Sequence, residues 1–85
     1  MKRTIELYGP LRSMNGGDAV ELDLPSGAGP YAVRLALEAW SRARGVSFAR
    51  ILERSVVAVA EEVLADADAI GDASVLAVLP PVCGG

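Results

Sequence analysis

The residues best suited to chemistry stand at the end of the sequence, in the segment Leu79-Pro80-Pro81-Val82-Cys83-Gly84-Gly85. A chain that finishes on two glycines presents a narrow backbone with a free carboxylate, because glycine carries no side chain. Pro80 and Pro81 fix their own φ and donate no backbone N–H, so the pair ends the preceding strand and keeps the tail extended. This combination predicts insertion of the tail into another protein.

The competing interpretation is an ordinary frayed terminus, since chain ends are often disordered and tolerant of change. The apolar run Ser74-Val75-Leu76-Ala77-Val78-Leu79 comes immediately before the prolines. A continuous apolar run of this length is typical of a strand buried on both faces, and therefore of a central position in a sheet. We expect the tail to leave from the middle of the fold and to be held firmly at its root.

Composition excludes several classes of function. The 85 residues are enough for one domain with a single modest core. The formal net charge is −3, and the eight lysines and arginines are spread along the chain without forming a cluster. Nucleic-acid binding needs a concentrated basic face, so no nucleic-acid partner is expected.

The sequence has no histidine and only one cysteine. It therefore lacks a ligand set for structural zinc or an iron–sulfur cluster, and it lacks a Ser-His-Asp device, so no metal site is predicted. A lone cysteine and the absence of a signal peptide indicate the cytoplasm. No apolar segment approaches the roughly 20 residues needed to cross a bilayer, so no membrane association is expected.

The elements that must position the tail follow from the hydrophobic periodicity. Polar and apolar residues alternate over 3–8 and again over 18–24, which predicts an antiparallel hairpin joined by a long loop. From 31 to 44 the period changes to about 3.6, with Pro30 as the first helical residue and Gly45 as the left-handed stop. The apolar stripe of this helix contains Val33, Ala36, Leu37, Trp40 and Ala43, with Trp40 expected as a core anchor.

The second half of the chain predicts shorter elements. Ser47 is placed to cap a short helical turn, residues 55–60 are a third strand, and a brief fourth strand surrounds 63–64. A turn then brings Ile70 into the core before the final strand. The expected fold is α+β with two layers, in which a mixed sheet of about five strands is covered on one face by one main helix. Residues 1–85 form a single domain, with the tail exposed from about residue 80.

At this point the sequence resembles a known family. The ending Pro80-Pro81-Val82-Cys83-Gly84-Gly85, together with Leu7-Tyr8-Gly9-Pro10-Leu11-Arg12, is similar to the small subunit of molybdopterin synthase (MoaD). That family consists of ubiquitin-like β-grasp sulfur carriers related to the thiamine sulfur carrier. The likeness covers essentially the whole chain in length and element order. Where the family usually has Asp-Gly-Asp before the final strand, this sequence has Asp72-Ala73-Ser74, which implies a different turn there.

The resemblance implies a two-step chemistry in which Gly85 carries the reacting group and Gly84 allows access to it. A ubiquitin-activating-like adenylyltransferase uses ATP and magnesium to convert the carboxylate to an acyl-adenylate, and sulfur from a persulfide donor then displaces AMP to leave a thiocarboxylate. The large subunit of molybdopterin synthase binds the tail and directs the sulfur onto a pterin precursor. The chain itself binds no cofactor and is a sulfur-donor subunit without an active site of its own.

The resemblance also implies a partner-binding surface. Tyr8 and Arg12 match the aromatic residue and the arginine of the family's first-strand motif, and Leu79 matches a bulky apolar residue before the prolines. The competing interpretations are that Tyr8 and Leu79 pack within the domain and that Arg12 is a solvated surface charge. The partner-binding stretch continues through Pro80, Pro81, Val82 and Cys83. Cys83 is interpreted as a small tail residue, with a redox or sulfur-relay role as the alternative.

Three functions remain in competition at this stage. The first is a sulfur carrier for molybdenum cofactor synthesis, or for another pathway such as thiamine, cysteine or tRNA thiolation. The second is a ubiquitin-like modifier that forms isopeptide bonds with lysines, and the third is an interaction module whose tail has no covalent fate. The acidic residues are interpreted as a solvated face, with steering toward a basic partner as the alternative. They are Glu61, Glu62, Asp66, Asp68 and Asp72.

Overall fold

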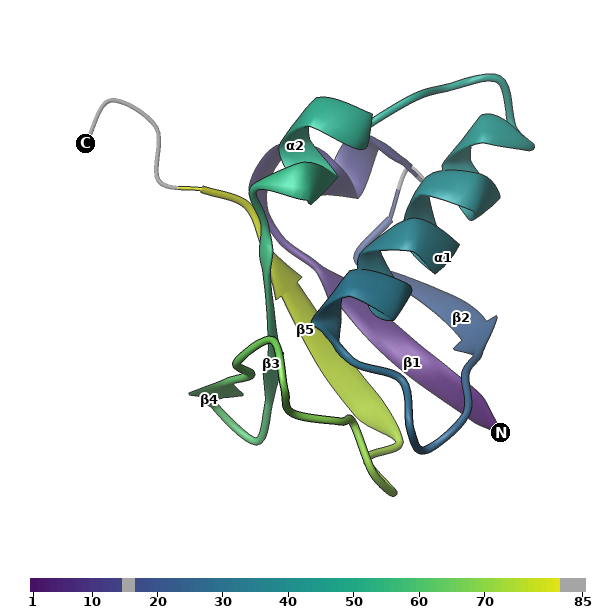
Figure 1. Cartoon of the computed structure of the whole chain (residues 1–85). Helices are drawn as coiled ribbons and strands as arrows, with labels where there is room; N and C mark the ends of the chain where they lie inside the picture. The colour runs from purple at the N-terminus through teal and green to yellow at the C-terminus, as the bar shows by residue number, and fades with distance from the viewer. Residues whose placement is uncertain (15–16, 82–85) are drawn as a thin grey trace.

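The computed structural model describes residues 1–14 and 17–81 of the chain. The elements, in chain order, are β1 (Lys2–Leu7), η1 (Gly9–Met14), β2 (Ala19–Asp23), α1 (Pro30–Arg42), α2 (Ala49–Glu53), β3 (Val56–Val59), β4 (Glu62–Val63) and β5 (Val75–Leu79). They form two layers, a five-stranded sheet in the order β2-β1-β5-β3-β4 and the helices that lie across one of its faces (Figure 1). The predicted α+β architecture is confirmed.

The final strand occupies the centre of the sheet. It pairs in parallel with β1, where Leu7 is opposite Val78, and antiparallel with β3, where Val56 is opposite Leu79. The predicted hairpin is also present, since β1 and β2 pair antiparallel from Lys2 opposite Asp23 to Glu6 opposite Ala19. A strand with a hydrogen-bonded neighbour on each side cannot shift without breaking both sets of bonds, so β5 is firmly fixed up to the residue that precedes Pro80.

The face of the sheet that α1 lies against is here named the covered face. Its side chains come from alternate strand positions, as the pleat requires, and they are closed off from water. Helix α1 contributes Val33 and Leu37, which are fully buried, and Ala36 and Trp40, which pack partly against the core. The buried strand residues on this face are Ile5, Leu7, Val20, Val57, Leu76 and Val78.

The opposite face, here named the open face, corrects one prediction. The apolar run before the prolines was expected to be buried on both faces, and this is wrong for Val75, which is 47% exposed, and for Ala77 and Leu79, which are partly exposed. All helices of the described residues lie on the covered side or at the sheet's ends, so no second layer covers the open face (Figure 1).

Helix α1 begins and ends as predicted, although its last regular residue is Arg42. Pro30 is its first residue, and Gly45 adopts φ +84 just beyond its last turn. There the N–H groups of Val46 and Gly45 donate to the carbonyls of Ser41 and Arg42, the paired arrangement typical of a glycine-terminated helix.

The start of α2 differs from the prediction. The Ser47 hydroxyl does not cap this helix and instead donates to Glu38 Oε2 at 3.0 Å, while Glu38 Oε1 accepts the Phe48 N–H at 3.1 Å. The N-cap residue is Phe48, without a side-chain cap bond. A charged acceptor forms stronger hydrogen bonds than a hydroxyl, so the Glu38 carboxylate of α1 holds the entry to α2.

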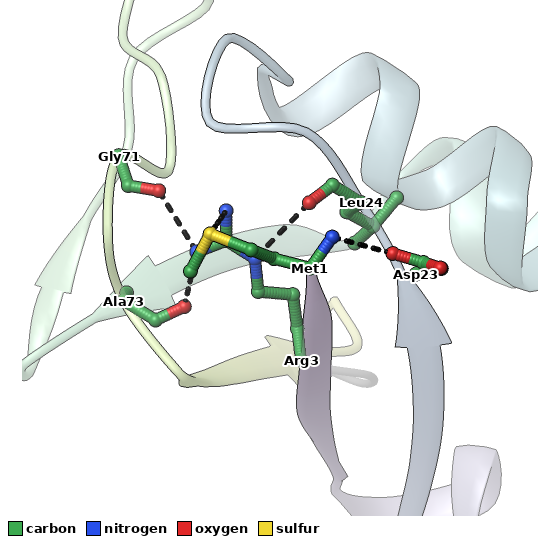
Figure 2. A network of polar contacts seen from close by, with 6 residues as sticks. All are labelled: Met1, Arg3, Asp23, Leu24, Gly71 and Ala73. Carbon is green, nitrogen blue, oxygen red and sulfur yellow. Dashed lines mark hydrogen bonds and ion pairs between the residues drawn. The ribbon is translucent and has the colours of Figure 1, made fainter.

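Arg3 is an unpredicted member of the core. Its side chain is 1% exposed and lies on the covered side of β1. The guanidinium donates from Nε to the Leu24 carbonyl at 3.1 Å and from Nη1 to the carbonyls of Gly71 and Ala73 at 2.8 and 2.6 Å (Figure 2). Three main-chain acceptors explain how an arginine is tolerated at this depth. The bonds join the end of β2 to the segment that leads into β5.

Candidate functional site

The site is the end of the sheet where β5 runs into the prolines. Leu79 is the last residue of β5, and Pro80 and Pro81 follow outside the sheet, each partly exposed. Proline lacks the N–H that would continue the pairing, so the strand ends where the sequence predicted. Four predicted site residues, Val82, Cys83, Gly84 and Gly85, lie outside the described residues.

Gly9 is a site residue that the sequence analysis missed. It adopts φ +58, a conformation that residues with a side chain rarely take. A Cβ placed on Gly9 would lie 3.2 Å from Pro80 Cγ, which is closer than ordinary van der Waals contact. Gly9, the second residue after β1, therefore lies against Pro80, the first residue after β5, and the absence of a side chain at Gly9 gives Pro80 room to pack there.

Tyr8 and Leu79 lie at the same end of the open face. Tyr8 is 38% exposed, and its hydroxyl donates to Glu6 Oε1 over a long 3.4 Å. Leu79 is partly exposed, and both residues line one shallow hollow. Neither side chain is enclosed in the core. Their role in partner binding stays a prediction.

Arg12 is positioned by the short helix η1. Leu11 of that helix is fully buried, which anchors η1 and leaves the next residue at the surface. Arg12 Nε lies 3.5 Å from the Leu7 carbonyl and 3.5 Å from Asp18 Oδ1, and the side chain is 56% exposed. Contacts this long at the surface constrain the guanidinium weakly, so it remains accessible for another partner.

The hollow on the open face has a volume of about 730 Å³. One row of residues crosses it on four strands, with Glu6 opposite Ala77, Ala77 opposite Ala58, and Ala58 opposite Val63. The two central residues are alanines, so the floor of the hollow is low, while larger side chains rise around it. Val63, 60% exposed, forms one wall. The sequence signal for this surface was present in the apolar run but was interpreted as burial within the domain.

A strained turn borders the same hollow. Ala60 and Glu61 connect β3 to β4 with φ of +52 and +68, and both residues line the hollow. Two consecutive residues at positive φ match the type I′ turn of a two-residue hairpin, which normally uses Asn-Gly or another glycine-containing pair. Neither residue here is glycine, so the turn stores strain at the rim of the exposed surface.

Metal and membrane functions gain no support from the described residues. Within 1–14 and 17–81, no three or more His, Cys, Asp or Glu side chains gather into a group that could hold a metal ion. In the same part of the chain, no helix combines the length and apolar character needed to span a membrane.

Comparison with known proteins places the fold in a class. No protein-family profile and no curated protein sequence matches the chain. Among solved structures, SAMP1 from Haloferax volcanii is similar over 100% of both chains, with 22% identity and a TM-score of 0.69. The small archaeal modifier protein 1 of H. volcanii gives 21% identity and a TM-score of 0.69 over 95% of this chain and 98% of the other.

A third similar structure is a protein from Pyrococcus furiosus assigned as molybdopterin converting factor, subunit 1. It shares 18% identity and a TM-score of 0.69 over 96% of this chain and 99% of its own. These likenesses define the class: the chain has the ubiquitin-like β-grasp fold that its sequence predicted. Within that class, its structural neighbours are a small protein modifier and a molybdopterin converting factor subunit.

Proposed function

We propose that this chain is a sulfur carrier that donates sulfur from a C-terminal thiocarboxylate on Gly85, as the small subunit of molybdopterin synthase. The observation that carries the proposal is the placement of Leu79, Pro80 and Pro81, here named the tail root. The central strand β5, paired on both sides, leads directly into Pro80 and Pro81, and two residues separate Pro81 from the Gly-Gly ending. A firmly fixed root suits the delivery of a narrow terminus to another protein's active site.

In the proposed chemistry the chain supplies the reacting carboxylate. The Gly85 carboxylate attacks the α-phosphorus of ATP on a magnesium-dependent adenylyltransferase, forming an acyl-adenylate and releasing pyrophosphate. A persulfide sulfur then attacks the acyl carbon, the bond to AMP breaks, and reduction of the remaining disulfide linkage by a thiol leaves the thiocarboxylate. Gly84 and Gly85 keep the acyl carbon accessible because they carry no side chain. General acid–base groups come from the partner enzymes.

The open face supplies the docking surface in this proposal. Tyr8 and Leu79 stand beside the tail root, and the hollow with its alanine floor continues along the same face. Exposed apolar side chains around a shallow depression are typical of a protein interaction site. The large subunit of molybdopterin synthase is the partner that the proposal assigns to this face, and the Pyrococcus neighbour's description supports that assignment.

Mass spectrometry of the chain purified from its native cell tests the proposal. We expect Gly85 as the last residue, with a fraction of the molecules heavier by the difference between one sulfur and one oxygen atom. Deletion of Gly85 should abolish that species and the sulfuration of the pterin precursor without changing thermal unfolding. A Gly85 deletion that leaves pterin sulfuration intact would contradict the proposal.

A ubiquitin-like modifier is the second candidate, because two of the similar structures are described as a small archaeal modifier protein. The same activated glycine would then react with a lysine amine of a target protein, and AMP would leave. The two candidates differ in the product: conjugates appear as additions of the whole chain to other proteins, whereas a carrier gains only sulfur. Conjugates that disappear on Gly85 deletion, without loss of pterin sulfuration, would favour the modifier.

A further inference from the structure

Charge is distributed unevenly along the chain. Residues 34–54 contain five arginines and two glutamates, a formal charge of +3, whereas residues 60–72 contain five acidic residues and no lysine or arginine, a formal charge of −5. The sequence alone showed basic residues without a cluster. The fold determines where the charged residues of these two segments lie on the surface.

Strand direction places the acidic segment and Arg54, the last residue of the basic segment, at opposite ends of the sheet. Strand β3 begins just after Arg54 and ends at the Ala60 turn, and β5 runs antiparallel to it. The acidic segment therefore lies at the end where β5 begins, and Arg54 lies at the end from which the tail leaves. Figure 1 shows α2 beside that tail end, with the β3–β4 turn and the segment before β5 at the far end.

Three exposed arginines belong to elements at the tail end of the sheet and are here named the tail-side arginines: Arg12 of η1, Arg50 of α2 and Arg54 just after α2. Val56 is opposite Leu79. Arg54 lies two residues before Val56, and Pro81 lies two residues after Leu79. On the other side Gly9 meets Pro80, and Arg12 follows within η1. Arg50 is exposed on α2.

The tail-side arginines have unused hydrogen-bonding capacity. In the described part of the chain, no ion pair or side-chain hydrogen bond involves Arg50 or Arg54, and Arg12 has only the two long contacts given above. Each guanidinium has five N–H donors in a planar fork that suits a carboxylate in bidentate geometry. Exposed arginines without a partner at a binding end are therefore available for an acidic surface.

We propose that the tail-side arginines dock on carboxylates that surround the entrance of the adenylyltransferase channel, and that residues 60–72 repel the same surface so that the domain approaches tail first. The inference rests on the proposed function. Opposite charges on two partners raise the association rate and fix orientation more than they raise affinity. The adenylate phosphate is not the target, because Gly85 of an extended tail reaches up to about 14 Å beyond Pro81.

Charge reversal at the two ends provides a matched test. Arg54→Glu and Lys2→Glu change the net charge equally, but Lys2 is exposed at the start of β1, the end opposite to the tail. We expect Arg54→Glu to slow association with the purified adenylyltransferase of the source organism by about 5- to 10-fold at low salt, with most of the effect lost near about 0.5 M salt. Lys2→Glu should stay within about twofold.

The kinetic readout separates docking from chemistry. Arg54→Glu should raise KM for the carrier while kcat for adenylation at saturation stays unchanged, because the variant alters encounter and not the acyl group. Thermal unfolding of both variants controls for folding. Equal effects of the two reversals would overturn the inference, as would faster association of Arg54→Glu, which would indicate a basic partner surface.

Failure of the proposed function is distinguishable from failure of the inference. If the native chain carries neither sulfur nor conjugates and is never adenylated, the proposed function fails. The arginine surface is then tested by NMR titration with a tetraglutamate peptide at low salt. Shifts confined to residues near Arg12, Arg50 and Arg54 and lost in Arg54→Glu would support the surface, whereas shifts spread over both ends or absent would overturn it.

Discussion

The covered face and the open face are built from alternate residues of the same strands, and they differ in how far their side chains are exposed to water. Within β5, Leu76 is 1% exposed and Val78 is fully buried, whereas Val75 is 47% exposed. Each strand thus supplies stability through one set of side chains and a possible contact surface through the set between them. The comparison teaches that folding and recognition can be altered separately by substituting adjacent residues.

The largest expected effect comes from Leu76→Ala compared with Val75→Ala. Leu76→Ala should reduce the free energy of unfolding by about 3–4 kcal/mol, because it removes buried methyl groups and leaves a cavity. Val75→Ala should cost less than about 1 kcal/mol, because its side chain is already half in water. Urea denaturation followed by circular dichroism measures both. Comparable losses would show that the open face is covered in solution.

Arg3 tests whether the covered face depends on polar as well as apolar contacts. Arg3→Met should destabilise the domain by about 2–3 kcal/mol, because three carbonyl acceptors lose a charged donor. Its neighbour Lys2 is exposed, and Lys2→Met should change stability by less than about 0.5 kcal/mol. Thermal unfolding of both variants measures the difference. An Arg3→Met variant as stable as Lys2→Met would mean that water satisfies the carbonyls equally well.

Comparing Gly9→Ala with Gly71→Ala tests the contact between Gly9 and Pro80. Gly9 and Gly71 have nearly the same φ, +58 and +61, but only Gly9 has a neighbour, Pro80 Cγ, within 4 Å of the position that an alanine methyl group would occupy. Both alanine variants should lose about 1 kcal/mol from backbone strain. Gly9→Ala should additionally weaken partner binding, since the methyl group displaces Pro80 and changes the direction of the tail.

A double-mutant cycle isolates the contact between Gly9 and the proline. Pro80→Ala removes the ring atom that the Gly9→Ala methyl group would meet, so the two substitutions should show a coupling energy of about 0.5 kcal/mol or more in partner binding. The cycle is measured by calorimetric titration with the adenylyltransferase. If the effects of Gly9→Ala and Pro80→Ala on the free energy of binding simply add, and Gly9→Ala weakens binding no more than Gly71→Ala does, then Gly9 is not part of the binding site.

The smallest effect concerns Asp23, at the exposed end of β2. The Met1 ammonium lies 2.6 Å from Asp23 Oδ1 and lowers the pKa of this carboxyl from its ordinary value of 3.8, first by the hydrogen bond and then by its charge. A lowered folded-state pKa contributes stability above pH 3.8 that is lost as pH falls through the folded pKa. Asp23→Asn should therefore slightly flatten the acid limb of stability against pH. An unchanged acid limb would show that solvent screens the pair completely.

Much of the fold could be predicted because its signals are local. Alternation over residues 3–8 and 18–24 gave the hairpin, and Pro30 with Gly45 gave the limits of the helix. The errors arose where residues distant in the sequence determine the local structure. Ser47 was expected to cap α2, but Glu38 of another helix binds it, and the burial of Arg3 depends on carbonyls about seventy residues away along the chain.

The candidate site was only partly predictable for a different reason. An apolar run has the same pattern whether its second face is covered by its own chain or left open for a partner, so Val75 and Leu79 could not be distinguished from core residues. Gly9 likewise resembled an ordinary turn glycine, because its contact with Pro80 exists only after β1 and β5 are placed side by side.

The parallel pairing of β1 with β5 has a mechanical consequence. A partner enzyme that draws on the chain at Pro81 pulls β5 along its own axis, between β1 on one side and β3 on the other. The hydrogen bonds of both ladders lie across the direction of that force, so they must break together in shear instead of one after another as in unzipping. The sheet should therefore resist a pull applied along β5 better than a pull applied across it.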